Sequence, residues 1–201
     1  MDLKNNRPSA IFLLVVGQIF TLLSCDSGDR RSQPEEKSFP ATTISNEDLV
    51  SRGKYLVNAI GCDDCHSPKR MGSQGPEIIA EKRFGGFPSG TQIPKVENAK
   101  GQWILFMPDL TASVGPWGMS FSANISSDET GIGNWTEAQF IRAIREGKYK
   151  GLPDSRPLLP PMPWPSYGQL NDEDLSAIFA FLKSTRPVRN VVPAPIPPDK
   201  L

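Results

Sequence analysis

The chain has 201 residues, and its 22 Lys and Arg residues balance its 22 Asp and Glu residues, so the formal net charge at pH 7 is zero. This balance argues against a nucleic-acid-binding surface and against a polybasic membrane-binding surface. The length favours one folded domain, and the composition includes a single histidine and three cysteines.

The first 24 residues are expected to be a secretion signal. Lys4 and Arg7 form a short basic region, and a mainly apolar run over 10–23 follows it. Such a run is too short to span a bilayer comfortably, which favours a signal peptide over a transmembrane helix. An exported protein on the periplasmic side of a bacterial membrane is therefore predicted.

Cys25 follows this apolar run directly. The stretch Leu22-Leu23-Ser24-Cys25 resembles the lipobox of bacterial lipoproteins, and the resemblance implies cleavage before Cys25 and acylation of its thiol. The alternative is an ordinary signal peptide that leaves Cys25 free. A leftover thiol would be unusual in an exported protein, so a lipid anchor is preferred.

The folded domain is expected over 45–186. Residues 25–44 before it are polar and charged without apolar periodicity, which predicts a flexible tether. The domain is predicted to open with a helix over 46–60. Side chains on one face of this helix recur at helical spacing, at Leu49, Gly53, Leu56, Val57 and Ile60.

The most specific motif of the chain comes next, after the helix-stopping Gly61. Cys62, Cys65 and His66 have the spacing C-x-x-C-H, the attachment signature of a c-type haem. Two thiols at this spacing add to the two vinyl groups of one porphyrin, and the adjacent imidazole reaches the iron. Because the motif occurs once, one covalently bound haem c is predicted.

Other uses of this motif fit the sequence less well than haem attachment. A structural zinc site usually needs four Cys or His ligands, and Cys25 is the only further candidate. A thiol-disulfide oxidoreductase of the thioredoxin type would place Cys62 and Cys65 in a βαβ unit, whereas the flanking residues predict a helix and then a loop. A structural disulfide between the two is a third alternative.

Residues 67–133 form a long segment rich in glycine and loop signals. Aromatic side chains are scattered through it, among them Trp103, Phe106, Trp117 and Phe121. Two roles are open to this insertion. It could pack over one edge of the haem, or it could form a docking surface.

Two further helices are predicted after the insertion. One begins at Thr136, which forms a capping box with Gln139, and it ends at Gly147. The other follows Asn171 and has an acidic first turn suited to the positive end of the helix dipole. Its apolar residues follow the i, i+3, i+4, i+7 pattern, at Leu175, Ile178, Phe179 and Leu182.

The second axial ligand of the iron cannot be a histidine of this chain, because His66 is the only one. Met1 is expected to be lost with the signal peptide, and Met71 follows His66 too closely to reach the opposite face of the ring, which leaves Met107, Met119 and Met162. The proline-rich segment around Met162 is stiff and loses little entropy when it orders, so Met162 is preferred. A lysine, another donor or an open site are the alternatives.

The final residues, 187–201, contain five prolines and are expected to be a tail without regular structure. Val191, Val192 and Ile196 could lay this tail in an extended conformation along the domain surface.

The order of these elements resembles that of the class I cytochromes c: a helix leads into C-x-x-C-H, a methionine follows later in the chain, and a final helix comes after it. The resemblance implies a mainly α fold with three core helices around one covalent haem, here with the long loop-rich insertion. It implies a crossing of the first and last helices, with Gly53, Tyr55 and Phe181 as candidate contacts. It also implies a carbonyl that holds the His66 ring, with Pro76 as the candidate, and it supports Met162 as the methionine ligand.

The segment from Asn124 to Trp135 (NISSDETGIGNW) resembles a motif of cytochrome subunits that serve membrane-associated dehydrogenases, with Ser127 in place of a proline. The predicted function is single-electron transfer between a respiratory or dehydrogenase donor and an acceptor protein, rather than enzymatic catalysis. The alternatives are a haem enzyme or ligand sensor with an open axial site, and a thiol-disulfide oxidoreductase.

Overall fold

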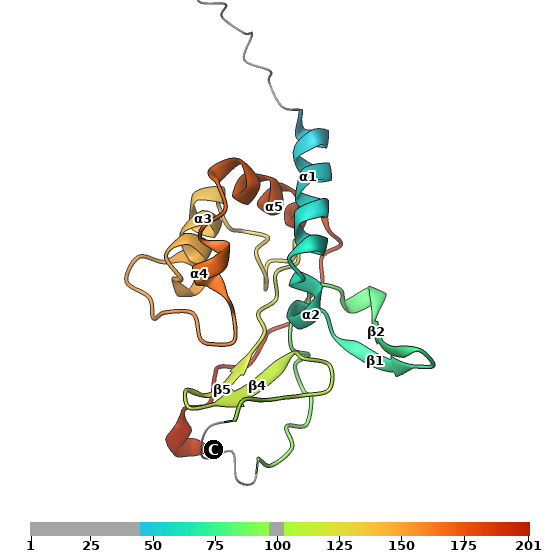
Figure 1. Ribbon diagram of the computed structural model, residues 1–201, viewed down its shortest axis with the longest axis vertical. Coiled ribbons are helices and arrows are strands. Elements are labelled where there is room, and N and C mark those ends of the chain that lie inside the picture. Colours follow the sequence, from blue (N-terminus) through green and yellow to red (C-terminus); the bar gives the residue numbers. More distant parts are fainter. Residues whose placement is uncertain (1–44, 97–102) are drawn as a thin grey trace, which may run out of the picture. The chain divides into compact units, whose positions relative to one another are not determined.

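The computed structural model describes residues 45–96 and 103–201 (Figure 1). The predicted signal peptide, Cys25, the tether and residues 97–102 lie outside the described residues. In the part of the chain that is described, no helix has the length and apolar character needed to cross a membrane.

The described region combines helices with two small antiparallel sheets. Its α-helices are α1 (Asn46–Ala59), α2 (Cys62–His66), α3 (Glu137–Arg145), α4 (Trp164–Tyr167) and α5 (Asp172–Ser184). Its strands are β1 (Lys69–Gly72), β2 (Gly75–Ile78), β3 (Leu105–Phe106), β4 (Ala112–Gly115) and β5 (Gly118–Phe121). Single 3-10 turns occur at η1 (Ala80–Lys82), η2 (Tyr149–Gly151) and η3 (Pro198–Lys200).

Helices α1 and α5 lie against each other (Figure 1). They cross closely at Gly53, as predicted. A Cβ atom at position 53 would lie 1.9 Å from the carbonyl oxygen of Ala177 and 2.7 Å from the Cβ atom of Phe181. Only a residue without a side chain fits there, which confirms Gly53 and Phe181 as crossing residues.

The expectation that Tyr55 also packs at this crossing is wrong. Its side chain is 64% exposed, because residues two apart on a helix point to different faces. Phe84 supplies the aromatic contact instead: its ring packs edge-on against Phe181, with centroids 6.1 Å apart. Phe84 follows the haem motif in the chain and is 1% exposed.

The predicted helix starts after the insertion are confirmed. The Oγ1 of Thr136 accepts a hydrogen bond from the Gln139 N–H at 3.2 Å, and the Oδ1 of Asn171 accepts from the Asp174 N–H at 2.7 Å. The capping box is only half formed, because the Gln139 side-chain amide donates to the Lys150 carbonyl instead. α3 ends at Arg145, before the predicted Gly147.

The segment over 67–133 is more ordered than the predicted loop-rich insertion. β1 and β2 form one hairpin, and β3, β4 and β5 form a sheet in that order. The strands have two to four residues each, too few for an alternating pattern to stand out in the sequence. Gly75 and Gly118 have positive φ angles at the hairpin turns, which glycine adopts without strain.

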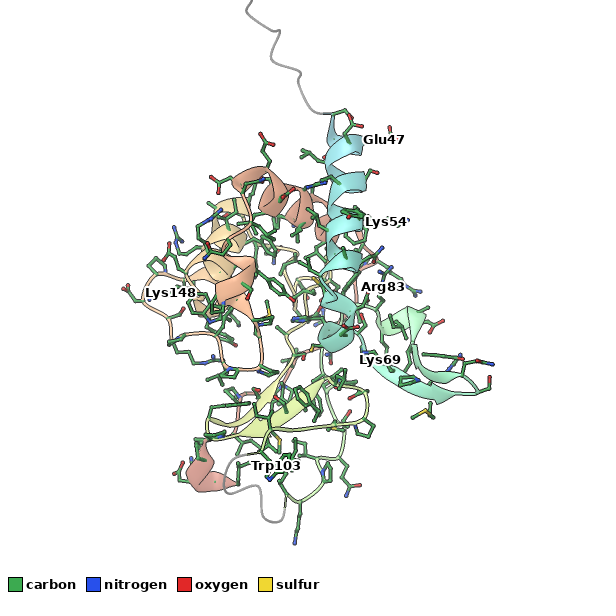
Figure 2. The ribbon with its side chains drawn as sticks, in the orientation of Figure 1. Glu47, Lys54, Lys69, Arg83, Trp103 and Lys148 are labelled. Atoms are coloured by element: carbon green, nitrogen blue, oxygen red, sulfur yellow. The ribbon has the colours of Figure 1, made fainter. Side chains whose placement is uncertain are left out.

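The aromatic residues of this insertion lie in different environments. The Phe121 ring packs on Phe87, with centroids 4.6 Å apart. Trp103 (Figure 2) is 79% exposed. Phe106 is 45% exposed. The Trp117 indole N–H donates to the Ser120 Oγ at 3.2 Å.

The C-terminal tail packs on the second sheet. The backbone of Ile196 exchanges hydrogen bonds with that of Met119 in β5, at 2.7 and 3.0 Å, as an extended tail predicts. The buried side chain of Asn124 donates to the carbonyls of Val188 and Asn190. The expected absence of regular structure is wrong at Ile196, which forms this β-bridge, and at Pro198–Lys200, which forms a 3-10 turn.

Candidate haem-binding site

The C-x-x-C-H motif folds as the one-turn helix α2. Gly61 before it has φ 73° and ψ 36°, a left-handed conformation that lets the chain leave α1 and start a new helix. Positions three and four apart on a helix share a face, so Cys62, Cys65 and His66 lie close together. Cys62 also packs against the core cluster formed by α1, α5 and Phe84.

The His66 ring is held by a backbone carbonyl, but not by the predicted one. Its Nδ1–H donates to the Ala123 carbonyl at 2.7 Å. Pro76 is wrong as the partner, because it lies in β2 opposite Met71. A proton on Nδ1 leaves Nε2 with its lone pair free, which is the state a metal-bound imidazole needs.

The pKa of His66 is lowered, and burial is the largest cause. The hydrogen bond to the Ala123 carbonyl and the charge of Asp63 act in the opposite direction but are weaker. A lowered pKa keeps the imidazole neutral, and only a neutral imidazole can donate to a metal. Geometry and charge therefore both leave His66 ready for ligation.

The cysteine thiols differ from those of redox-active pairs. Burial, followed by the charge of Asp63, raises the pKa of Cys62 to about 12. Burial also raises the pKa of Cys65. A thiol-disulfide oxidoreductase needs at least one thiol with a lowered pKa.

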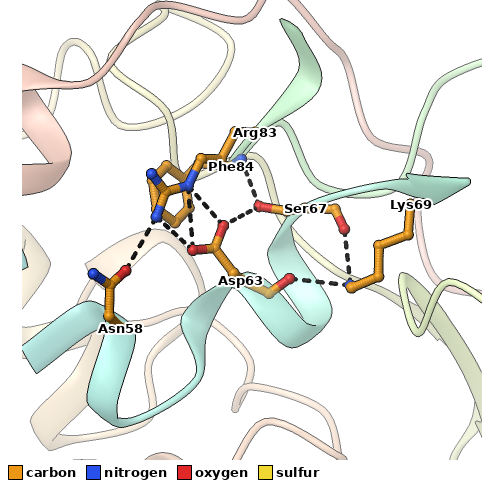
Figure 3. A network of polar contacts seen from close by, with 6 residues as sticks. All are labelled: Asn58, Asp63, Ser67, Lys69, Arg83 and Phe84. Atoms are coloured by element: carbon orange, nitrogen blue, oxygen red, sulfur yellow. Dashed lines mark hydrogen bonds and ion pairs between the residues drawn. The ribbon is translucent and has the colours of Figure 1, made fainter. Parts of the chain in front are cut away.

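Asp63, the residue after Cys62, is the centre of a polar network that holds α2 in place (Figure 3). Its carboxylate accepts hydrogen bonds from the Arg83 guanidinium, at 3.0 Å from Nε and 2.6 Å from Nη2. The buried Ser67 Oγ donates to the same carboxylate at 2.6 Å. Arg83 also donates to the Asn58 side chain at 3.1 Å, which links α2 to the end of α1.

The backbone after Arg83 is joined to α2 as well. The Phe84 N–H donates to the Ser67 Oγ at 2.9 Å, and the Gly86 N–H donates to the His66 carbonyl at 2.9 Å. Phe84 has a φ of 63°, a strained conformation for a side chain of this size. Its burial against Phe181 and these two hydrogen bonds hold it there.

Lys69 closes the other end of α2. Its Nζ donates to the carbonyls of Asp63, Asp64 and Ser67 at 2.7 to 3.1 Å. A cation at a helix C-terminus satisfies carbonyls that have no partner within the helix. The same ammonium group donates to the Asp109 carbonyl at 3.1 Å, so it also ties the insertion to the motif.

Met162, the predicted second ligand, lies half-buried in the segment before α4. The Pro160 carbonyl accepts from the Ser120 Oγ of β5 at 2.6 Å. The Tyr167 hydroxyl of α4 donates to the Ile60 carbonyl at 2.9 Å, just before the motif. The segment that carries Met162 is thus fastened on one side to β5 and on the other to the end of α1.

The other methionines lie elsewhere. Met71 is 72% exposed on the first hairpin, and Met119 is buried in β5. Met107 lines a groove of about 260 Å³ together with Met71 and Asp109. This groove includes none of the predicted haem ligands. Over the described ranges 45–96 and 103–201, no group of three His, Cys, Asp or Glu side chains is placed to hold a metal ion.

The residues of α2 fit a covalently bound haem. They offer two thiols one turn apart and an imidazole whose Nδ1 is already engaged. A model of the family "Cytochrome c" matches residues 50–186. The chain belongs to the cytochrome c family.

Curated relatives of this cytochrome c are named as dehydrogenase subunits. The "Gluconate 2-dehydrogenase cytochrome c subunit" of Pantoea cypripedii is 34% identical over 72% of this chain and 25% of its own length. The "Fructose dehydrogenase cytochrome subunit" of Gluconobacter japonicus is 30% identical over 81% of this chain and 26% of its own. The "Alcohol dehydrogenase (quinone), cytochrome c subunit" of Gluconobacter oxydans is 39% identical over 72% of this chain and 23% of its own.

The predicted similarity to cytochrome subunits of dehydrogenases is therefore confirmed. This cytochrome c spans about a quarter of the length of these three relatives.

Sequence reasoning missed Asp63, Arg83 and Ala123. An acidic residue inside the motif gave no signal, because charged residues on one-turn helices usually face solvent. Arg83 and Ala123 are separated from the motif by 17 and more residues and acquire their roles only through tertiary contact. Ala123 acts through its backbone, which no side-chain pattern can reveal.

Proposed function

We propose that this cytochrome c transfers single electrons through one haem c bound to Cys62, Cys65 and His66, with Met162 as the second axial ligand. When bound, haem c supplies an iron that takes up or releases one electron. Cys62 and Cys65 would provide the two thioether links, and the Nε2 of His66 would ligate the iron. The hydrogen bond from His66 Nδ1 to the Ala123 carbonyl is the observation that supports this assignment best.

A methionine opposite the histidine would fill both axial positions and raise the reduction potential. A site filled in this way has no free position for a substrate, so the proposed role is an electron carrier rather than an enzyme. The raised thiol pKa values of Cys62 and Cys65 argue against thiol-disulfide exchange, which requires a thiolate.

The proposed donor is a dehydrogenase or another respiratory protein, in keeping with the names of the relatives. The chain would be exported and held at the periplasmic side of a bacterial membrane by a lipid on Cys25. A second redox protein would accept the electron, and no nucleic acid is involved.

Haem-stained denaturing gels and absorption spectra test this function. Only thioether-bound haem survives denaturation, so the wild-type band should stain and the band of Cys62→Ser with Cys65→Ser should not. Reduced wild-type protein should not bind carbon monoxide rapidly. An unstained wild-type band would contradict haem attachment, and rapid carbon monoxide binding would instead support an open axial site.

The axial methionine has its own test. Met162→Ala should change the visible spectrum, lower the reduction potential and open the iron to carbon monoxide. Met71→Ala and Met107→Ala are matched controls that should leave the spectrum unchanged. An unchanged spectrum in Met162→Ala, or a changed one in Met107→Ala, would contradict the assignment of Met162.

A further inference from the structure

Asp63 carries a negative charge within the attachment motif, and haem attachment does not require this charge. It precedes His66 by three residues on the same one-turn helix, a spacing that places the two Cβ atoms about 5–6 Å apart. Its carboxylate is only 15% exposed. A sheltered charge at this distance acts on the iron site with little screening by solvent ions.

Arg83 compensates this charge through the ion pair described above, and its side chain is 37% exposed. The loop over 83–86, which begins with Arg83, contacts α2 at two further points. The Phe84 N–H donates to the Ser67 hydroxyl, and the Gly86 N–H donates to the His66 carbonyl. Figure 3 shows the ion pair and the contact from Phe84 to Ser67, whose hydroxyl in turn donates to Asp63. The loop thus contacts α2 at three points, and Arg83 compensates the charge of Asp63.

We propose that the Arg83–Asp63 ion pair positions the attachment helix and balances the charge beside the iron, so that it tunes the reduction potential of this cytochrome. The inference rests on the proposed function, because it requires haem at α2. Asp63 and Arg83 are positioning residues, since they act through α2 and the electrostatic field rather than by ligating iron.

The sign of the potential shift separates this role from a merely structural one. The oxidised iron centre carries one more positive charge than the reduced centre. Asp63→Asn leaves the Arg83 cation uncompensated, which disfavours the oxidised form and should raise the potential. Arg83→Gln leaves the Asp63 anion uncompensated and should lower the potential. Loss of structure alone would shift both variants in the same direction.

Potentiometric titration of the purified haem-containing protein measures these shifts. The double variant, Asp63→Asn with Arg83→Gln, should return close to the wild-type potential, because the pair is again neutral. Arg83→Lys keeps the charge but loses the paired hydrogen bonds, and it should also stay close to wild type. Asp174→Asn is the matched control: Asp174 pairs with Arg52 at 2.9 Å and is 14% exposed, but it lies on α5. It should leave the potential unchanged.

Shifts of one sign in both single variants, or no shift in either, would overturn the proposal. If Asp63→Asn yields no folded protein, Arg83→Gln and Arg83→Lys decide alone: a drop only in Arg83→Gln supports the proposal, and equal potentials contradict it. A wild-type protein without haem stain would refute the proposed function itself, whereas a stained protein with shifts of one sign would refute only the role of this pair.

Discussion

Gly53 of α1 lies so close to Ala177 of α5 that a Cβ atom at position 53 would meet the Ala177 carbonyl oxygen at 1.9 Å. The two helices make this approach just before the chain enters the haem motif. Two residues separate α1 from α2, and Cys62 packs against the same core cluster, so the crossing bears on the site as well as on the core.

Gly53→Ala is expected to destabilise the protein by about 3 kcal/mol, because the added methyl group forces the two backbones apart. In an exposed helix the same change would stabilise by about 1 kcal/mol, so the sign is diagnostic. Chemical denaturation of the haem-containing protein measures it. Ser51→Ala, at an exposed position of α1, is the control and should have little effect. A Gly53→Ala protein as stable as wild type would show that the helices do not meet here.

Asn124 binds the C-terminal tail through hydrogen bonds. It directly follows Ala123, whose carbonyl holds the His66 ring. Its buried amide donates to the carbonyls of Val188 and Asn190, and its Oδ1 accepts from the N–H and hydroxyl of Ser126. Asn124→Ala should cost about 3 kcal/mol, because these buried groups lose their partners.

The tail of Asn124→Ala should also be cleaved faster in limited proteolysis. Asn134→Ala, at an exposed position, should match wild type in both denaturation and proteolysis. Equal cleavage rates for Asn124→Ala and wild type would mean that the tail is held by other contacts.

Asp128 contributes stability that depends on pH. Hydrogen bonds from the Thr130 hydroxyl, and then from its N–H, lower the pKa of Asp128 below its ordinary value of 3.8. A lowered folded-state pKa gives a contribution that is complete above the unfolded value and is lost as the pH falls through the folded value. The stability advantage of wild type over Asp128→Asn should therefore shrink as the pH falls below about 3.8.

Thermal unfolding of both proteins between about pH 6 and about pH 2 measures this difference. A difference in melting temperature that stays constant over the whole range would contradict the role of the Asp128 charge.

Cys25→Ser should abolish lipid attachment and release the protein from the membrane fraction of a bacterial host. Each buried CH₂ of a lipid chain contributes about 0.8 kcal/mol to membrane binding, so loss of the chains should be decisive. Incorporation of labelled fatty acid, together with cell fractionation, provides the readout. Cys62→Ser is the control, because it should keep the lipid label while disturbing haem attachment. Labelling that persists in Cys25→Ser would rule out the lipobox interpretation.

A large part of this protein can be predicted from local sequence patterns. The apolar stripe before Gly61, the capping residues Thr136 and Asn171, and the C-x-x-C-H spacing each act within a few residues. For that reason the helix starts and the family could be predicted from the chain alone. Gly53 was also predictable, because a glycine within an apolar helix face indicates a close crossing.

Tertiary structure decided which distant groups complete the site. Phe84 rather than Tyr55 packs on Phe181, and the Ala123 carbonyl rather than that of Pro76 holds His66. The short strands of the insertion pair because the chain folds back on itself at tight turns, two of which have a glycine with positive φ, Gly75 and Gly118. A backbone carbonyl and a salt bridge across 20 residues leave no periodic trace in a sequence, since the partners are chosen by the packing of the whole domain.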